Sequence, residues 1–209
     1  MRTNLSSQIS LNRVSPKYYK PENAVERSVL TRFEKVPTDI YETVDEGVQH
    51  IADEIAAKIH ERQREGKFCV IGAGTGASLR PLYAELVRKH KDEGLSFRNV
   101  VIFNLYEYYP VAAEGAGSSF AQLNDLFLGE IDIDKQNVFT IDGTIPQEAV
   151  IEYCRLYEQR IQTFGGMDII LMGIGREGNI AMNEPGSSLS SPTRLILIAS
   201  TSRAEAAHN

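Results

Sequence analysis

Short apolar runs separated by helix-like stretches constrain the fold of this chain more than any other feature of its sequence. Runs of about four to eight apolar residues that alternate with amphipathic stretches are typical of parallel strands covered by helices on both faces. The pattern therefore predicts an α/β fold with a doubly wound, mostly parallel, Rossmann-like sheet. The predicted strands are Phe68–Ile71, Val100–Phe103, Val138–Ile141, Met167–Met172 and Leu195–Ile198.

The stretches between these runs carry the periodicity of helices. Thr43 and Glu46 form a capping-box pattern at the start of the first stretch. Apolar residues then recur at helical spacing on one face: Val44, Val48, Ile51, Ile55 and Ile59. Further helices are predicted over Leu79–Lys91, over Phe120–Leu128 and over a segment that starts near Thr144 and runs to about Ile161.

Length and composition predict one α/β domain that carries an arm. The 209 residues are enough for a sizeable core, and 42% hydrophobic and 24% charged residues are typical of a globular protein. Residues 1–36 are polar and contain Pro16 and Pro21, with little periodicity before Ala24. We predict an N-terminal arm over residues 1–36 and the α/β domain over residues 37–209.

The charge balance and the short apolar runs exclude two classes of partner. Lys and Arg number 22 against 28 Asp and Glu, so the formal net charge is −6, and no dense basic stripe is present. Nucleic acid is therefore not an expected partner. No apolar run approaches the about 18 residues of a membrane span. The polar N-terminus lacks the apolar core of a signal peptide, so we expect a cytoplasmic protein.

The cysteines show no pattern of a redox or metal site. Cys69 and Cys154 lie in apolar surroundings without C-x-x-C spacing, and the histidines lie outside the glycine-rich loops. We predict both cysteines to be small core residues, and we expect neither a metal nor another cofactor.

Glycine-rich loops follow two of the predicted strands, at the edge where parallel sheets bind ligands. Gly72–Ser78 offers backbone N–H groups, two hydroxyls and a following helix N-terminus, which together suit an anion such as phosphate. A tight strand-to-helix connection is the alternative. The loop Gly173–Gly178 matches G-x-G-x-x-G, but Pro185 soon interrupts the helix that a dinucleotide site requires. The polar residues of that loop can equally serve only to stabilise turns.

Motifs in these loops resemble the glucosamine-6-phosphate isomerase/deaminase family, which is related in fold to the 6-phosphogluconolactonases. Gly74-Thr-Gly-Ala-Ser78 resembles the family's T-G-G-T/S phosphate loop, and Phe103-Asn-Leu-Tyr-Glu-Tyr108 resembles F-N-x-D-E-Y. The segment from Gly173 to Ser188 resembles G-x-G-x-D-G-H-I-A-F-N-E-P-x-S-S. The resemblance covers roughly residues 37–207 and implies the following phosphate-binding residues: Gly74, Thr75, Gly76, Ala77, Ser78 and Arg203.

The resemblance also implies a chemistry. The substrate would be an aminohexose phosphate, whose ring is opened with help from a histidine. An aspartate then moves the proton at C2 and ammonia leaves, without a metal or redox cofactor. The groups that move protons act as general acids and bases, each contributing about 10²–10⁴-fold in rate.

This sequence departs from the family pattern at two of the implied catalytic positions. Tyr106 stands where the family has the C2 base aspartate, and Asn179 stands where it has the ring-opening histidine. A tyrosine, with a pKa near 10, is a poor base at neutral pH, and an asparagine does not titrate. Carboxylates stand at the other implied catalytic positions, which are Glu107, Glu177 and Glu184.

Three functions stay open from the sequence. The chain can be a deaminase with altered catalytic groups, a catalytically silent sugar-phosphate-binding or regulatory domain of a larger fused protein, or a lactonase-like hydrolase. The third requires a water-activating base in the loop where Asn179 stands. The family continues through further strands, helices and a phosphate-binding lysine, so we expect this fold to be incomplete at its C-terminus. Because the family often assembles, a homo-oligomer also stays open.

Overall fold

The computed structural model describes residues 21–33, 36–175 and 177–206. The chain divides into two compact units, residues 1–50 and residues 51–209. In the first unit α1 spans Ala24–Thr31, and the Asn23 side chain caps it by accepting a hydrogen bond from the Glu26 amide at 2.9 Å. No residue of α1 is buried, and its eight residues are too few to repeat an apolar spacing over several turns. Most of the predicted arm, residues 1–20, lies outside the described residues.

Helix α2 spans Val44–Arg64 and confirms the predicted amphipathic helix. The Glu46 amide donates to Thr43 Oγ1 at 3.2 Å, as the capping-box pattern indicates. The second unit includes Ala52, Ile55 and Ile59, which are the buried residues of this helix. Their spacing places them on the face that packs against the sheet.

The second unit contains a four-stranded parallel sheet in the order β3-β2-β1-β4. The strands are β1 (Cys69–Ala73), β2 (Val100–Asn104), β3 (Val138–Phe139) and β4 (Ile169–Leu171). The chain proceeds from β1 outward to β3 and then returns to place β4 on the other side of β1. This reversal is the topological switch point of a doubly wound sheet, where the carboxyl ends of β1 and β4 leave room for a ligand.

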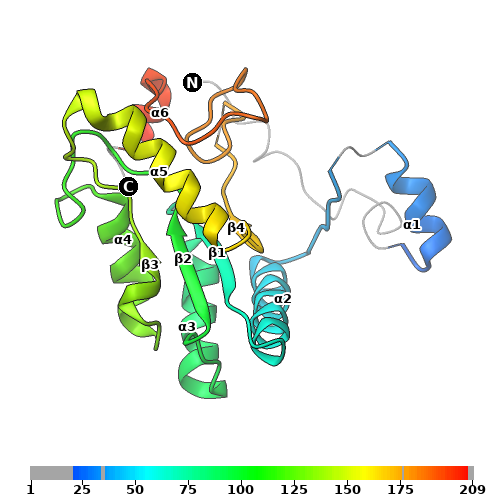
Figure 1. Cartoon of the computed structure of the whole chain (residues 1–209). Coiled ribbons are helices and arrows are strands. Elements are labelled where there is room, and N and C mark those ends of the chain that lie inside the picture. The colour runs from blue at the N-terminus through cyan, green and yellow to red at the C-terminus, as the bar shows by residue number, and fades with distance from the viewer. Residues whose placement is uncertain (1–20, 34–35, 176, 207–209) are drawn as a thin grey trace. The chain divides into compact units, whose positions relative to one another are not determined.

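Helices cover both faces of this sheet, which confirms the predicted fold class (Figure 1). On one face α2 and α3 (Arg80–Glu93) pack against the sheet in the larger core cluster, next to α4 (Ser119–Leu126). On the other face α5 (Val150–Thr163) contributes Tyr157 to a cluster with Val70, Val101 and Phe103. Alternate residues of each strand thus enter opposite cores. Short 3₁₀ turns at Leu128–Glu130, Lys135–Asn137 and Gln147–Ala149 complete the connections.

The predicted strand Leu195–Ile198 is wrong. This segment forms no strand, and Leu197 is 89% exposed. Apolar character favours burial, but a strand also needs a partner for its backbone hydrogen bonds, and the ladders of the described sheet do not include this segment. After it comes α6 (Ser200–Ala206), which no pattern in the sequence indicates.

Candidate functional site

Three loops meet at the carboxyl edge of the sheet around the switch point. The Gly74 amide donates to Leu171 O at the end of β4, and the Leu105 amide donates to Ala73 O at the end of β1. A Cβ placed on Gly173 would lie 3.0 Å from Ser78 Oγ, so the loops after β1 and β4 touch. The predicted phosphate loop therefore lies against the loops that carry the other predicted site residues.

The loop after β1 is held in place by hydroxyl groups from three other segments. Tyr83 on α3 donates its hydroxyl to Gly74 O at 2.5 Å. The Thr75 amide donates to Tyr106 Oη at 2.9 Å, and Tyr106 Oη in turn donates to Thr75 O. Thr75 Oγ1 lies 3.1 Å from Tyr106 Oη and 3.0 Å from Ser119 Oγ. Tyr106 and Thr75 are thus direct partners in the described structure.

Two features of this loop follow from its tight packing. A Cβ on Gly72 would lie 2.6 Å from Met167 Sδ and 2.8 Å from a Leu105 methyl carbon, so a larger residue would require these two side chains to move. Burial raises the pKa of Tyr106 above its usual value, although hydrogen bonds from Thr75 and Ser119 oppose the shift. The Tyr106 phenol is accordingly protonated at neutral pH.

Glu107 points its carboxylate at the N-terminus of α4. One oxygen accepts from the amides of Tyr108 at 2.8 Å and Ser119 at 2.9 Å. The other accepts from the Ser118 hydroxyl at 2.7 Å and the Phe120 amide at 3.0 Å. A carboxylate at a helix N-terminus satisfies orphan amides and interacts favourably with the helix dipole. Glu107 therefore anchors α4 in this conformation instead of facing open solvent.

The loop after β4 separates its predicted site residues. The Asn179 side chain donates to Ala181 O at 3.1 Å, within its own loop. Glu184 accepts from the Ala199 amide at 3.1 Å and the Ser202 hydroxyl at 2.8 Å, which ties it to the start of α6. Glu177 and Arg203 are exposed, and neither side chain is hydrogen-bonded to the glycine loop in the part of the chain that the structure describes.

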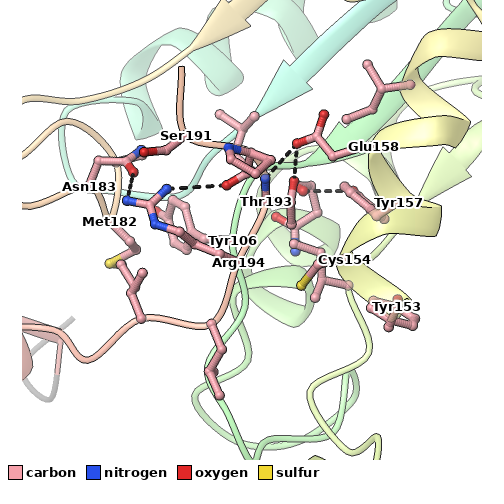
Figure 2. A pocket seen from close by; sticks show the side chains of 18 of the residues that line it. Tyr106, Tyr153, Cys154, Tyr157, Glu158, Met182, Asn183, Ser191, Thr193 and Arg194 are labelled. Carbon is pink, nitrogen blue, oxygen red and sulfur yellow. Dashed lines mark hydrogen bonds between the residues drawn. The ribbon is translucent and has the colours of Figure 1, made fainter. Parts of the chain in front are cut away.

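A cavity of about 490 Å³ lies between α5, the loop after β2 and residues 181–196 (Figure 2). Its lining is largely apolar and aromatic, with Tyr106 among the side chains that face it. Glu158 on α5 accepts from the Thr193 amide and hydroxyl at 2.7 and 2.6 Å. Arg194 donates to Asn183 Oδ1 at 3.0 Å and to Ser187 Oγ at 3.2 Å. Glu158 and Thr193 lie 35 positions apart in sequence, so no local motif marks this pair, whereas Arg194 bonds within the segment that follows β4.

Sequence reasoning also missed Asn104, although it lies inside the motif Phe103–Tyr108. Its side chain is 1% exposed, and neither its Nδ2 nor its Oδ1 has a hydrogen-bond partner among the described residues. Buried amides without partners are rare and destabilising. Because Asn104 also lines the cavity beside α5, we add it to the candidate residues at this edge of the sheet.

Metal-binding clusters and membrane-spanning helices are both absent from the described residues. Residues 21–33, 36–175 and 177–206 include no group of at least three His, Cys, Asp or Glu side chains that could hold a metal ion. No helix in the same residues is long and apolar enough to cross a membrane.

Comparison with known proteins identifies what this chain is similar to. The family model described as glucosamine-6-phosphate isomerases/6-phosphogluconolactonase matches residues 42–208. A glucosamine-6-phosphate deaminase-like protein of Bacteroides thetaiotaomicron is 62% identical over 206 residues, which cover 99% of this chain and 31% of that protein.

Solved structures of two further proteins have the same fold. A monomeric glucosamine-6-phosphate deaminase aligns with a TM-score of 0.72 at 34% identity, over 78% of this chain and 65% of that one. A 6-phosphogluconolactonase from Thermotoga maritima aligns with a TM-score of 0.52 at 24% identity, over 64% of this chain and 58% of that one, and shows the fold alone. The chain thus spans less than two thirds of the length of each of these relatives.

Proposed function

The chain belongs to the glucosamine-6-phosphate isomerase/6-phosphogluconolactonase family, and from this premise we propose that it binds an aminohexose phosphate at the loop Gly74–Ser78. The observation that carries the proposal is the position of this loop at the switch point between β1 and β4, directly before α3. Ligands of doubly wound sheets bind at such points, and helix N-termini favour phosphate there.

Three of the residues proposed to hold the phosphate are accessible to a ligand. Ala77 and Ser78 are exposed, and Gly76 is half-buried, so their backbone amides can face an anion from solvent. In this proposal Arg203 supplies positive charge from α6, and Ser78 contributes its hydroxyl.

We propose that deamination by this chain is slow. The Tyr106 phenol is protonated at neutral pH, Asn179 carries no titratable proton, and Glu107 is occupied at α4. Glu177 is the exposed carboxylate of the third loop and remains the proposed acid or base there. Since each positioned acid or base contributes about 10²–10⁴-fold, the loss of two lowers the rate by several powers of ten.

The test of this proposal is release of ammonia and formation of fructose 6-phosphate from glucosamine 6-phosphate. The double variant Tyr106→Asp, Asn179→His restores the acid–base groups of the family pattern. We expect it to exceed the unmodified chain by at least about 10²-fold in kcat. The single variants serve as controls and should gain less. A natural rate equal to that of the double variant would contradict the proposal that these positions limit turnover.

The second candidate function is binding without turnover, as a domain of a larger protein. It is favoured by the engagement of Tyr106 and Glu107 in local hydrogen bonds and by the relative of which this chain spans 31%. Calorimetry that detects hexose-phosphate binding, together with an ammonia rate equal to that of buffer, would select it. Lactone hydrolysis is not favoured, because Asn179 supplies no base in the third loop.

A further inference from the structure

We propose that Tyr106 is an internal competitor at the Gly74–Ser78 loop: a ligand that uses the polar groups of Thr75 must first displace the Tyr106 hydroxyl. The inference rests on the proposed function, since it takes this loop as the ligand site. It adds a residue that determines which ligands enter and how tightly they bind.

The first support is that one oxygen atom, Tyr106 Oη, contacts the amide, the carbonyl and the hydroxyl of Thr75. Tyr106 Oη accepts from the Thr75 amide at 2.9 Å, donates to the Thr75 carbonyl and lies 3.1 Å from the Thr75 hydroxyl. An anion that binds in the loop would use that same amide and hydroxyl. The phenol oxygen therefore stands where a ligand oxygen would stand.

The second support is the close approach of the ring to the loop backbone. A Cβ on Gly74 would lie 3.2 Å from Tyr106 Cε1 and 3.2 Å from Leu171 O. Glycine at position 74 thus permits the aromatic ring to cover the loop, as well as permitting the approach of a ligand.

The third support is the position of Tyr106 between the loop and the cavity beside α5. Tyr106 lines this cavity, whereas residues 74–78 do not (Figure 2). Its hydroxyl at the same time bonds to the loop on its other side. Displacement of the side chain would therefore join the loop to a cavity of about 490 Å³, which is within the range of small-molecule sites.

The chemistry of the replacement favours one ligand class. The tyrosine hydroxyl both donates and accepts, whereas the phosphoryl group of a sugar phosphate dianion only accepts. A phosphoryl group alone would leave the Thr75 carbonyl without a donor, and an unpaired polar group is unfavourable. An aminohexose phosphate carries hydroxyl and ammonium donors beside its phosphate and can replace both interactions. The arrangement thus favours an aminohexose phosphate, which carries several donors, over inorganic phosphate, which as HPO4²⁻ carries one.

Displacement reduces the apparent affinity, because only the fraction of molecules with Tyr106 displaced is competent to bind. Removing the hydroxyl with Tyr106→Phe preserves the ring and frees the Thr75 amide. We expect Tyr106→Phe to bind inorganic phosphate roughly tenfold more tightly than the unmodified chain, and to prefer the aminohexose phosphate less strongly.

The experiment is calorimetric titration of both chains with inorganic phosphate and with glucosamine 6-phosphate. Tyr109→Phe is the matched control, because its hydroxyl bonds to Ile145 O at 3.2 Å and not to the loop. Tighter phosphate binding by Tyr106→Phe alone supports the inference. Equal or weaker binding by Tyr106→Phe, with binding intact in the unmodified chain, overturns it while leaving the proposed function standing. Binding by neither chain overturns both proposals.

Amide hydrogen exchange at Thr75 gives a second readout that needs no ligand. In the unmodified chain this amide should exchange slowly, and Tyr106→Phe should accelerate it at least about tenfold while neighbouring strand amides are unchanged. Fast exchange in the unmodified chain would overturn the inference, since the amide would then already be open.

Discussion

At the scale of single residues, Tyr106 and Glu107 at the carboxyl edge have hydrogen-bond partners that lie well apart in sequence. Glu107 reaches α4 across 11 to 13 positions, and Tyr106 reaches Thr75 across 31. The motifs identified which residues gather at this edge. They could not indicate the partner of each side chain, because those partners are brought in by tertiary folding.

Asn104 permits a prediction about stability. Its buried amide has no partner among the described residues, so Asn104→Leu, of similar volume, removes an unsatisfied polar group. We expect the free energy of unfolding to rise by about 1 kcal/mol, measured by urea denaturation. Asn124→Leu on the exposed face of α4 is the control and should change it by less than about 0.5 kcal/mol. A marked loss of stability in Asn104→Leu would show that the amide has a structural partner.

At the scale of elements, the strength of the apolar pattern decided what could be predicted. The stripe that includes Ile55 and Ile59 predicted α2, and the runs that became β1 and β2 were found because their residues are buried. Helix α1 was not predicted because its eight residues are too few to repeat an apolar spacing as the 21 residues of α2 do. Leu195–Ile198 was wrongly predicted as a strand, because an apolar run indicates burial but does not supply a strand to pair with.

Asp168 connects α2 to the sheet and gives a pH-dependent prediction. Burial raises its pKa, but hydrogen bonds from the Arg62 side chain and the Val70 amide outweigh this and hold the pKa below its usual value. A carboxylate with a lowered folded pKa stabilises the fold above its unfolded pKa of about 3.9, and the stabilisation is lost as pH falls through the folded value. Asp168→Asn should therefore lower stability by about 2 kcal/mol at pH 7.

The pH profile distinguishes this ion pair from a packing effect. The difference between Asp168→Asn and the unmodified chain should shrink as the pH falls below about 4, because the native carboxylate is then protonated. Glu65→Gln removes an exposed partner of Arg62 and serves as the control, because its free energy of unfolding should change far less than that of Asp168→Asn. A difference that stays constant from pH 7 to pH 3 would contradict the assignment.

Glu107 supports a prediction for α4. In Glu107→Gln an amide N–H₂ group replaces an oxygen that accepts hydrogen bonds at the helix N-terminus, so donors face donors. We expect the free energy of unfolding to fall by about 2 kcal/mol in chemical denaturation. The exposed Glu114→Gln should leave it within about 0.5 kcal/mol. An unchanged free energy of unfolding in Glu107→Gln would contradict the role of Glu107 as an anchor of α4 and would favour the catalytic role that the family pattern implies.

At the scale of the whole molecule, the strand order and the family agree on where a ligand should bind. The order β3-β2-β1-β4 places the glycine loop after β1 beside the loop after β4, as the predicted doubly wound sheet requires. The boundary at residue 36, the cytoplasmic location, the lack of a nucleic-acid partner and the oligomeric state stay predictions. These four predictions concern the surface of the protein and its place in the cell, and the order of the strands determines neither.

The central claim is that the loop Gly74–Ser78 binds an aminohexose phosphate, and one calorimetric titration tests it most directly. Glucosamine 6-phosphate is titrated into the unmodified chain and into Ser78→Glu, which places a negative charge in the loop. Glucosamine, which lacks the phosphate, is the ligand control. Ser28→Glu, in exposed α1, is the variant control. We expect saturable binding by the unmodified chain and by Ser28→Glu, and binding at least roughly tenfold weaker by Ser78→Glu at an unchanged melting temperature. No binding by the unmodified chain, or equal binding by Ser78→Glu, would contradict the claim.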